Sequence, residues 1–475
     1  MKTLIQKWRQ MPASAKSSIA FVLSSFVLKG ISFLTTPIFT RLMDQTQYGI
    51  IAEYNSWLSI IDVFALLGLT SAGVFNVGLN DYRDSRDQYI SSVLSLCNLT
   101  TIGVFGILWA ARMVMGPDFL LPDSLLLLMF IHFIFSPAQV FWITRQKYEF
   151  KYKAAFLTTV GSTLISQVLS MILVKNILEN QGAVRLWSSE IGALLFTVPI
   201  YLMLCWRGKK FINFPLWKQV LVFALPLIPH YLAQHIMSSA DRIMVAEMVS
   251  EADAGIYSVV ANISMVATIV WSAINGSLIA YTFENLREKA YAKINSTATM
   301  LILGYGVVCF GICLIAPEVL AILAPEEYYS GIYAVPPIAG VAFLSALYNI
   351  FANIEFYHKK STYITISTIT ASVINFVLNW ILIPRYSFVA ASYTTLFSYI
   401  VLVFMHYRGY RKSTPDRIYN GRNFLLVSAG SILACLCCNL LYGNTMLRWG
   451  IILIMGVAVL WKHKFILNLI KSLRK

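Results

Sequence analysis

The stretch from Phe223 to Met248 reads FALPLIPHYLAQHIMSSADRIMVAEM and is long enough to cross a bilayer. On a helix with about 100° per residue, its polar and apolar side chains fall on opposite faces. An ionisable side chain on a spanning helix indicates a functional site, because burying charge in hydrocarbon is costly. We therefore expect one face to pack against lipid or other helices and the other to meet water or a polar ligand. The polar face carries His230, Tyr231, Gln234, His235, Ser238, Ser239, Asp241 and Arg242.

The composition is that of a membrane protein. The 475 residues are 58% hydrophobic and 12% charged, and the mean hydropathy is +0.67. Apolar runs recur along almost the whole chain, which excludes a series of soluble domains. The basic N-terminus precedes an apolar stretch too long for the core of a cleaved signal peptide, so we expect a retained first span. We predict an all-α polytopic membrane protein.

The seven cysteines lie within or at the edges of apolar segments. None lies in a polar loop among other metal-ligating residues, so neither a disulfide framework nor a zinc site is predicted. We interpret them as packing residues and expect no metal and no cofactor.

Fourteen segments are candidate membrane spans. Only the turn Pro384-Arg385-Tyr386 separates the eleventh from the twelfth. The expected spans are about 17–40, 50–73, 89–111, 120–142, 154–176, 188–206, 219–248, 254–280, 295–317, 331–355, 362–383, 387–406, 423–442 and 446–462.

Loop charge predicts the orientation. Counted alternately from a cytoplasmic N-terminus, 29 of the 37 Lys and Arg residues fall on the cytoplasmic side and 6 on the other. The two that remain, Lys29 and Arg242, lie inside spans. The uneven distribution also supports the span count, because one miscounted span would scramble every later loop. We expect both termini in the cytoplasm.

Polar stripes mark the first, second, seventh and eighth spans. Lys29 lies near the middle of the first, and Asn55 and Asp62 lie seven residues apart on the second. These are equivalent pairs of helices if the chain consists of two six-helix halves. The candidate cavity residues are Lys29, Arg242, Asn55, Asp62, His230, Gln234, Asp241, Ser264, Thr268 and Asn275.

Each stripe also has a structural interpretation. Ser and Thr stripes on spanning helices often make only helix–helix contacts, and the stripe from Thr365 to Asn375 is an example. Asp62 is a candidate partner of a cation, a coupling-ion site or a packing contact. Glu355 is expected to pair with Lys359, one helical turn later.

Two short segments look alike. Asp44–Ile50 follows the first span, Glu251–Tyr257 follows the seventh, and each is a polar turn that enters the next span through Gly-Ile. Because six spans separate them, the two copies would share one orientation, as in a parallel repeat.

Two stretches carry a family resemblance. Pro37–Gly49 (PIFTRLMDQTQYG) and Leu225–Tyr257, with its LP, ADRIM and AGIY segments, resemble the Wzx-type O-antigen and polysaccharide flippases. These flippases belong to the multidrug/oligosaccharidyl-lipid/polysaccharide (MOP) exporter superfamily, whose drug exporters form the MATE family. Length, span count and basic cytoplasmic loops agree with this resemblance over essentially the whole chain.

The resemblance implies a MATE-like, V-shaped pair of six-helix bundles, residues 1–210 and 211–410. Residues 411–475 would add two helices and a basic cytoplasmic tail. It also implies alternating access in a bacterial inner membrane. The substrate would be an undecaprenyl-diphosphate-linked oligosaccharide, moved from the cytoplasmic to the periplasmic leaflet as part of lipopolysaccharide or other surface-glycan biosynthesis. A coupling ion, Na⁺ or H⁺, is left open, and other polysaccharide assembly proteins are candidate partners; no nucleic acid is expected.

Other functions remain as alternatives. A cation-coupled multidrug exporter of the same superfamily would favour an anionic cavity. A lipid II flippase would need several arginines in the first two spans, which hold only Arg41, at the edge. A membrane glycosyltransferase or polysaccharide polymerase generally carries a sizeable extracytoplasmic loop, and the loops expected on that side are short. A scaffold or receptor would not explain charges inside spans.

Overall fold

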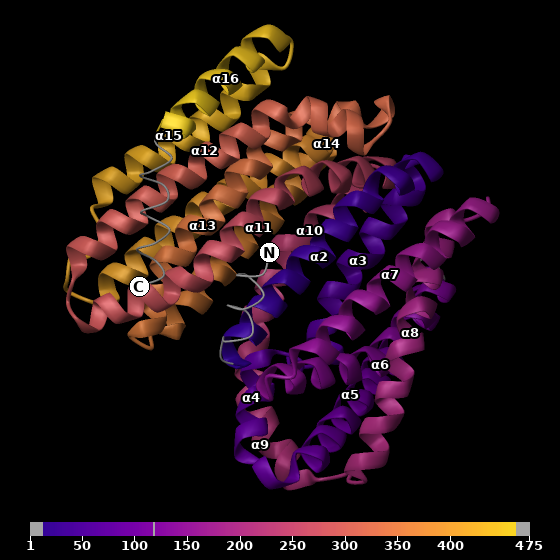
Figure 1. Cartoon of the computed structure of the whole chain (residues 1–475). Coiled ribbons are helices and arrows are strands. Elements are labelled where there is room, and N and C mark those ends of the chain that lie inside the picture. Colours follow the sequence, from indigo (N-terminus) through magenta and orange to yellow (C-terminus); the bar gives the residue numbers. More distant parts are fainter. Residues whose placement is uncertain (1–12, 117–118, 462–475) are drawn as a thin grey trace, which may run out of the picture. The chain divides into compact units, whose positions relative to one another are not determined.

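The computed structural model describes residues 13–116 and 119–461, and these residues form helices and short connections with no strand among them (Figure 1). The basic ends of the chain, with Lys2, Lys7 and Arg9 at one end and the tail from residue 462 at the other, lie outside the described residues. The location of the termini therefore stays a prediction.

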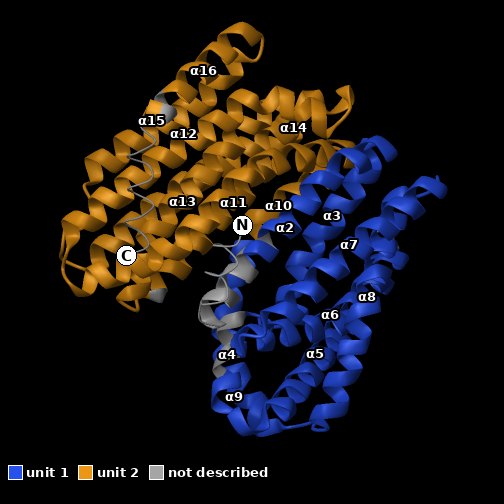
Figure 2. Ribbon diagram, viewed as in Figure 1, with its two compact units in different colours: residues 1–235 blue, residues 236–475 orange. Residues whose placement is uncertain are grey.

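The chain forms two compact units, residues 1–235 and 236–475 (Figure 2). The division falls inside α10 (Ile228–Met248). The division into residues 1–210, 211–410 and 411–475 stays a prediction.

Unit 1 is a bundle in which α7 packs against both α8 and α2. A Cβ atom on Gly192 of α8 would lie 2.6 Å from the Cα of Ser166 on α7, so the glycine lets the two backbones touch. The unit comprises α2 (Ala13–Leu42), α3 (Gln45–Ala65), α4 (Ala72–Asp81), η1 (Arg83–Ser85), α5 (Arg86–Met115), α6 (Asp123–Tyr148), α7 (Tyr152–Asn176), α8 (Gln181–Gly208), α9 (Phe214–Ala224), η2 (Leu225–Leu227) and the start of α10.

Unit 2 is built around α13. In the apolar window of the segment Glu326–Tyr357, 72% of the residues are buried, the highest share among the candidate spans of the described chain. Helix α13 therefore forms the core of the unit and has little surface for lipid or a ligand. The other elements are the rest of α10, α11 (Glu251–Arg287), α12 (Tyr291–Leu323), η3 (Glu326–Ala334), α13 (Val335–Tyr357), α14 (Ser361–Ser413), α15 (Gly421–Leu441) and α16 (Thr445–Trp461).

The predicted all-helical, many-span fold is confirmed. Ten described segments are long and apolar enough to cross a membrane, and each of the fourteen expected spans overlaps at least one helix of the described chain. The eleventh and twelfth both lie in α14, where Ser387 breaks the helix with φ 56° and ψ −158°.

Two expected spans are not continuous helices. The helix from Phe223 onward is interrupted by the 3₁₀ turn Leu225–Leu227, which contains Pro226, because proline has no N–H to donate and clashes with the preceding turn. The second span was expected to run to residue 73, but α3 ends at Ala65, and Gly68 in the following turn has φ +67°. A Cβ atom there would lie 2.8 Å from the ring of Tyr231.

The two similar segments begin their helices in the same way. Asp44 accepts a hydrogen bond from the backbone N–H of Gln47 at the start of α3, at 2.8 Å. Ser250 accepts one from the N–H of Asp253 at the start of α11, at 3.1 Å. Each cap satisfies a donor that the first helical turn leaves free.

Candidate functional site

Asp241 on α10 is buried in a network of neutral donors within unit 2. Its carboxylate accepts hydrogen bonds from Tyr257 on α11 at 3.0 Å, Asn379 on α14 at 2.7 Å and Thr395, also on α14, at 2.7 Å. Asn375 in turn donates to Thr395 at 3.1 Å. Asp241 therefore joins α10 to α11 and to both halves of α14.

The stripe on the eleventh span is part of this packing. Thr368, Ser372 and Asn375 are all buried, and Asn375 bonds within the network around Asp241. For Asn375, the structure therefore shows the predicted contact between helical segments. The Thr368 hydroxyl bonds instead to the Ile364 carbonyl of its own helix.

Arg242, the next residue along α10, has different surroundings. Its side chain is half-buried, and it donates to the Ser258 hydroxyl at 3.2 Å and to the Ser238 carbonyl at 2.8 Å. Both acceptors are neutral, and within the described chain Arg242 forms no ion pair. The guanidinium also interacts electrostatically with the neighbouring Asp241 carboxylate, which is not within ion-pair distance. Its charged donors are thus not taken up by a carboxylate contact and can bind an anion.

The remaining candidates of unit 2 lie on α11, and the structure divides them. The Thr268 side chain is exposed, Asn275 is half-buried and Ser264 is buried. In the described chain, neither the Ser264 hydroxyl nor the Asn275 amide oxygen has a hydrogen-bond partner. On α10 itself, the Ser238 side chain is exposed. Thr268 and Ser238 are therefore reachable from outside unit 2.

In unit 1, Lys29 on α2 is half-buried and forms no ion pair with any described residue. Asn55 on α3 is exposed and Asp62, two turns later, is half-buried. On the first part of α10, His230 is half-buried and Gln234 is exposed. The ten candidates thus divide equally, with five in each unit.

The sequence analysis missed a second ionisable cluster in unit 1. His132 on α6 contacts Glu190 on α8 through Nδ1 and a carboxylate oxygen, 2.9 Å apart, and His132 also interacts electrostatically with Asp62. His132 and Glu190 both fall within expected spans. An ionisable residue inside a span indicates a functional site, so the sequence alone could have identified both. Among the described residues, no group of three or more His, Cys, Asp and Glu side chains could hold a metal ion.

The expected pairing of Glu355 with Lys359 is wrong. Glu355 on α13 is fully buried and bonds to Nδ1 of the buried His406 on α14, at 2.7 Å. The imidazole stacks on Tyr348, with ring centroids 5.3 Å apart. Spacing along one helix could not reveal this partner, because His406 is distant in sequence and meets Glu355 only through the packing of α13 on α14.

Glu149, between α6 and α7, is the centre of an ion-pair network. It bonds to Arg145 at 2.9 Å and to Lys151 at 2.6 Å, with Arg86 3.6 Å away. Partial burial alone would raise the pKa of the Glu149 carboxyl, but the hydrogen bonds from Lys151 and Arg145 outweigh it and hold the pKa below its usual value. The network joins the first turn of α5 to the C-terminal end of α6 and the loop between α6 and α7.

Residues 14–286, more than half of the chain, match the model of a family described as polysaccharide biosynthesis protein. The chain belongs to this family. Two relatives come from Haemophilus influenzae: protein 1 of the Lsg locus, 22% identical over 367 residues, and an uncharacterized membrane protein, 23% identical over 368. Each alignment covers 76% of this chain and 88% of the relative.

Solved structures of MOP-superfamily transporters share the fold of this polysaccharide biosynthesis protein. The lipid II flippase MurJ, in an inward closed conformation, matches with a TM-score of 0.64 at 14% identity, over 95% of this chain and 99% of that one. An inward-facing MATE multidrug resistance transporter matches with a TM-score of 0.60 at 14% identity, over 81% and 93%. The predicted resemblance to the MOP-superfamily polysaccharide flippases is confirmed. The protein is a multi-pass membrane protein.

Proposed function

We propose that the protein is a flippase, not an enzyme, that moves an undecaprenyl-diphosphate-linked oligosaccharide across the bacterial inner membrane by alternating access. The oligosaccharide would be a repeat unit of O-antigen or a related surface glycan, carried from the cytoplasmic to the periplasmic leaflet. The family's description supports a role in polysaccharide biosynthesis. The fold shared with a lipid II flippase supports a lipid-linked substrate.

The observation that carries the proposal is a pair of available cations inside spans. Lys29 in unit 1 and Arg242 in unit 2 are both half-buried, and neither forms an ion pair within the described chain. An intramembrane cation without a carboxylate partner is costly unless an anion or water meets it. The diphosphate of the lipid carrier is an anion that both an ammonium and a guanidinium bind well.

Neutral polar side chains would form hydrogen bonds with the sugar. Asn55, Gln234 and Thr268 are exposed, and amides and hydroxyls can both donate to and accept from sugar hydroxyls. The buried Asp241 would hold the packing around Arg242 in place without touching substrate, since its oxygens are already bonded to protein donors.

The energy source is a separate part of the proposal. Asp62, His132 and Glu190 place titratable groups inside the spans of unit 1, and proton or Na⁺ coupling would act through such groups. The same groups are what a cation-coupled multidrug exporter would need. Drug efflux that persists in the Lys29→Ala and Arg242→Ala variants would favour that alternative.

Replacing Lys29 or Arg242 tests the proposed function. Each Ala variant should lose most surface-glycan export, because the diphosphate loses a cation that faces it, while insertion into the membrane stays normal. The measurement is surface glycan in a strain that depends on this protein, with protein level in the membrane fraction measured alongside.

Lys175→Ala, at the exposed C-terminal end of α7, is the matched control and should export normally. Full export by both the Lys29 and Arg242 variants at normal protein levels would contradict the proposal. Sugar transfer from nucleotide-sugars by the purified protein would instead support a glycosyltransferase.

A further inference from the structure

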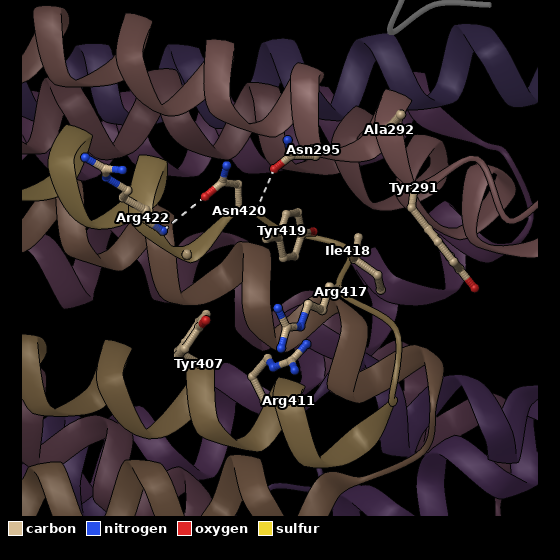
Figure 3. A pocket seen from close by; sticks show the side chains of 11 residues that line it. Tyr291, Ala292, Asn295, Tyr407, Arg411, Arg417, Ile418, Tyr419, Asn420 and Arg422 are labelled. Atoms are coloured by element: carbon tan, nitrogen blue, oxygen red, sulfur yellow. Dashed lines mark hydrogen bonds between the residues drawn. The ribbon is translucent and has the colours of Figure 1, made fainter.

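Unit 2 contains a cavity that the transport proposal does not use. It has a volume of about 830 Å³ and opens where α14 ends and where α12 and α15 begin (Figure 3). Loop charge predicts this side to be cytoplasmic. Its wall includes Arg411, Arg417, Arg422, Tyr291, Tyr407 and Asn295.

The charge of the cavity is positive. Three arginines line it, and no carboxylate does. In the described chain, the side chains of Arg417 and Arg422 form no hydrogen bond or ion pair, while Arg411 donates only to a backbone carbonyl, that of Asp416, at 3.4 Å. In Figure 3 the side chains of Arg411 and Arg417 point toward one another. Two guanidinium groups in this arrangement repel each other unless an anion lies between them.

One acidic residue, Asp416, lies in this loop but does not line the cavity. Its carboxylate accepts hydrogen bonds from Tyr291 at 2.5 Å and Thr414 at 3.5 Å, and its single negative charge is outnumbered by the three arginines. The α12 and α15 helices also begin at the cavity, with Tyr291 and Gly421. Helix N-termini carry partial positive charge, so they add to the field of the arginines.

The cavity has a fixed floor. Tyr419 is buried and packs against Phe351, Tyr410 and Phe424, with ring centroids between 5.2 and 5.7 Å apart. The backbone N–H of Tyr419 donates to the Tyr410 hydroxyl at 3.1 Å. The loop that carries Arg417 is thus anchored before any ligand binds, which lowers the entropic cost of binding.

An apolar surface continues from the cavity along α15. Leu425 and Leu426 are 69% and 61% exposed, and they lie three and four residues after Arg422, on the same face of the helix. A cationic cavity followed by an apolar helix surface suits a lipid, whose phosphate would lie at the arginines and whose acyl chain would lie along the leucines. A free phosphate ion would contact only the arginines.

We propose that this cavity binds the phosphate-bearing headgroup of an anionic membrane lipid. Guanidinium groups match phosphate oxygens in pairs, and basic pockets between helices at the cytoplasmic surface suit anionic headgroups. The site is separate from Lys29 and Arg242, and its occupancy does not depend on what the protein transports.

The test uses the purified full-length protein in nanodiscs of phosphatidylcholine, titrated with a fluorescent phosphatidylglycerol. Arg417→Gln and Arg422→Gln should each weaken lipid binding by about tenfold, because each removes a charged donor to phosphate. Arg408→Gln is the control, since Arg408 is exposed, lies over Phe404 and does not line the cavity. Thermal melting checks that each variant is folded, and Arg417→Lys, which keeps the charge but not the paired geometry, should bind at an intermediate level.

Three results would overturn the proposal. In the first, Arg408→Gln weakens lipid binding as much as the cavity variants do. In the second, neither cavity variant weakens lipid binding. In the third, inorganic diphosphate binds as tightly as the lipid. The last result would assign the cavity to a free anion. Unchanged transport by the cavity variants, together with weaker lipid binding, would leave the proposal intact.

Discussion

At the scale of single residues, Asp241 and Arg242 show how neighbours on one helix acquire different roles. Successive side chains on a helix point about 100° apart. Asp241 therefore faces α14, where Asn379 and Thr395 donate to it, while Arg242 faces Ser258 of α11. The polar face drawn from the sequence contains both residues and could not separate them, because the α14 residues that bond only to Asp241 lie more than a hundred positions away in the sequence.

Replacing Asp241 should destabilise unit 2. In Asp241→Leu, the donors on Tyr257, Asn379 and Thr395 lose their acceptor inside the protein, at a cost of about 1–3 kcal/mol for each unsatisfied group. Asp241→Asn should cost less, because its amide oxygen can still accept from Asn379 while the two hydroxyls turn to accept from its NH₂. In detergent, the melting temperature should be highest for the wild type, lower for Asp241→Asn and lowest for Asp241→Leu. Equal melting temperatures of the two variants would show that Asp241 does not stabilise unit 2 as a hydrogen-bond acceptor.

At the scale of the element, α14 shows what separates two spans without a loop. Pro384 cannot donate a backbone hydrogen bond, which predicts a turn here, and the break is at Ser387. A φ of 56° with ψ −158° belongs to a region populated almost only by glycine. The serine thus holds strained backbone at the junction of the eleventh and twelfth spans.

Ser387→Gly should relieve this strain and raise the free energy of unfolding by about 1 kcal/mol. Ser398→Gly is the matched control in the same helix: it lies in regular α-helix, is buried and donates to the Thr394 carbonyl. There, glycine should lower stability by about 1 kcal/mol. Chemical denaturation of both variants in detergent measures the change in the free energy of unfolding. A decrease in both variants would show that the backbone at residue 387 is not strained.

At the scale of the whole molecule, the membrane orientation can be tested. Thr46 is exposed at the start of α3, and Lys412 is exposed in the last turn of α14. Loop charge predicts that the first lies on the periplasmic side and the second on the cytoplasmic side. In a background with Cys437→Ser, an impermeant maleimide should label Thr46→Cys in spheroplasts and Lys412→Cys only after permeabilisation. The reverse pattern would invert the topology, and with it the predicted direction of transport.

The sequence by itself determined the helical class and the approximate number and order of the helices, and it singled out Lys29 and Arg242 as the basic residues expected inside spans. These follow from properties read along the chain: apolar length, helical period and loop charge. Helix ends were less predictable where a turn depends on local conformation, as at Leu225–Leu227 and Gly68. The matches to known proteins confirm the fold that the motifs suggested.

Only the tertiary structure decided which polar residues are already bonded to protein. It placed Asp241 in a buried network, joined Glu355 to His406 and brought Arg411, Arg417 and Arg422 to one cavity. The physical reason is that hydrogen bonds and ion pairs depend on separation in space. A helical wheel reports the direction of a side chain but not the helix that it meets, and residues more than a hundred positions apart, such as Asp241 and Asn379, meet only when helices pack.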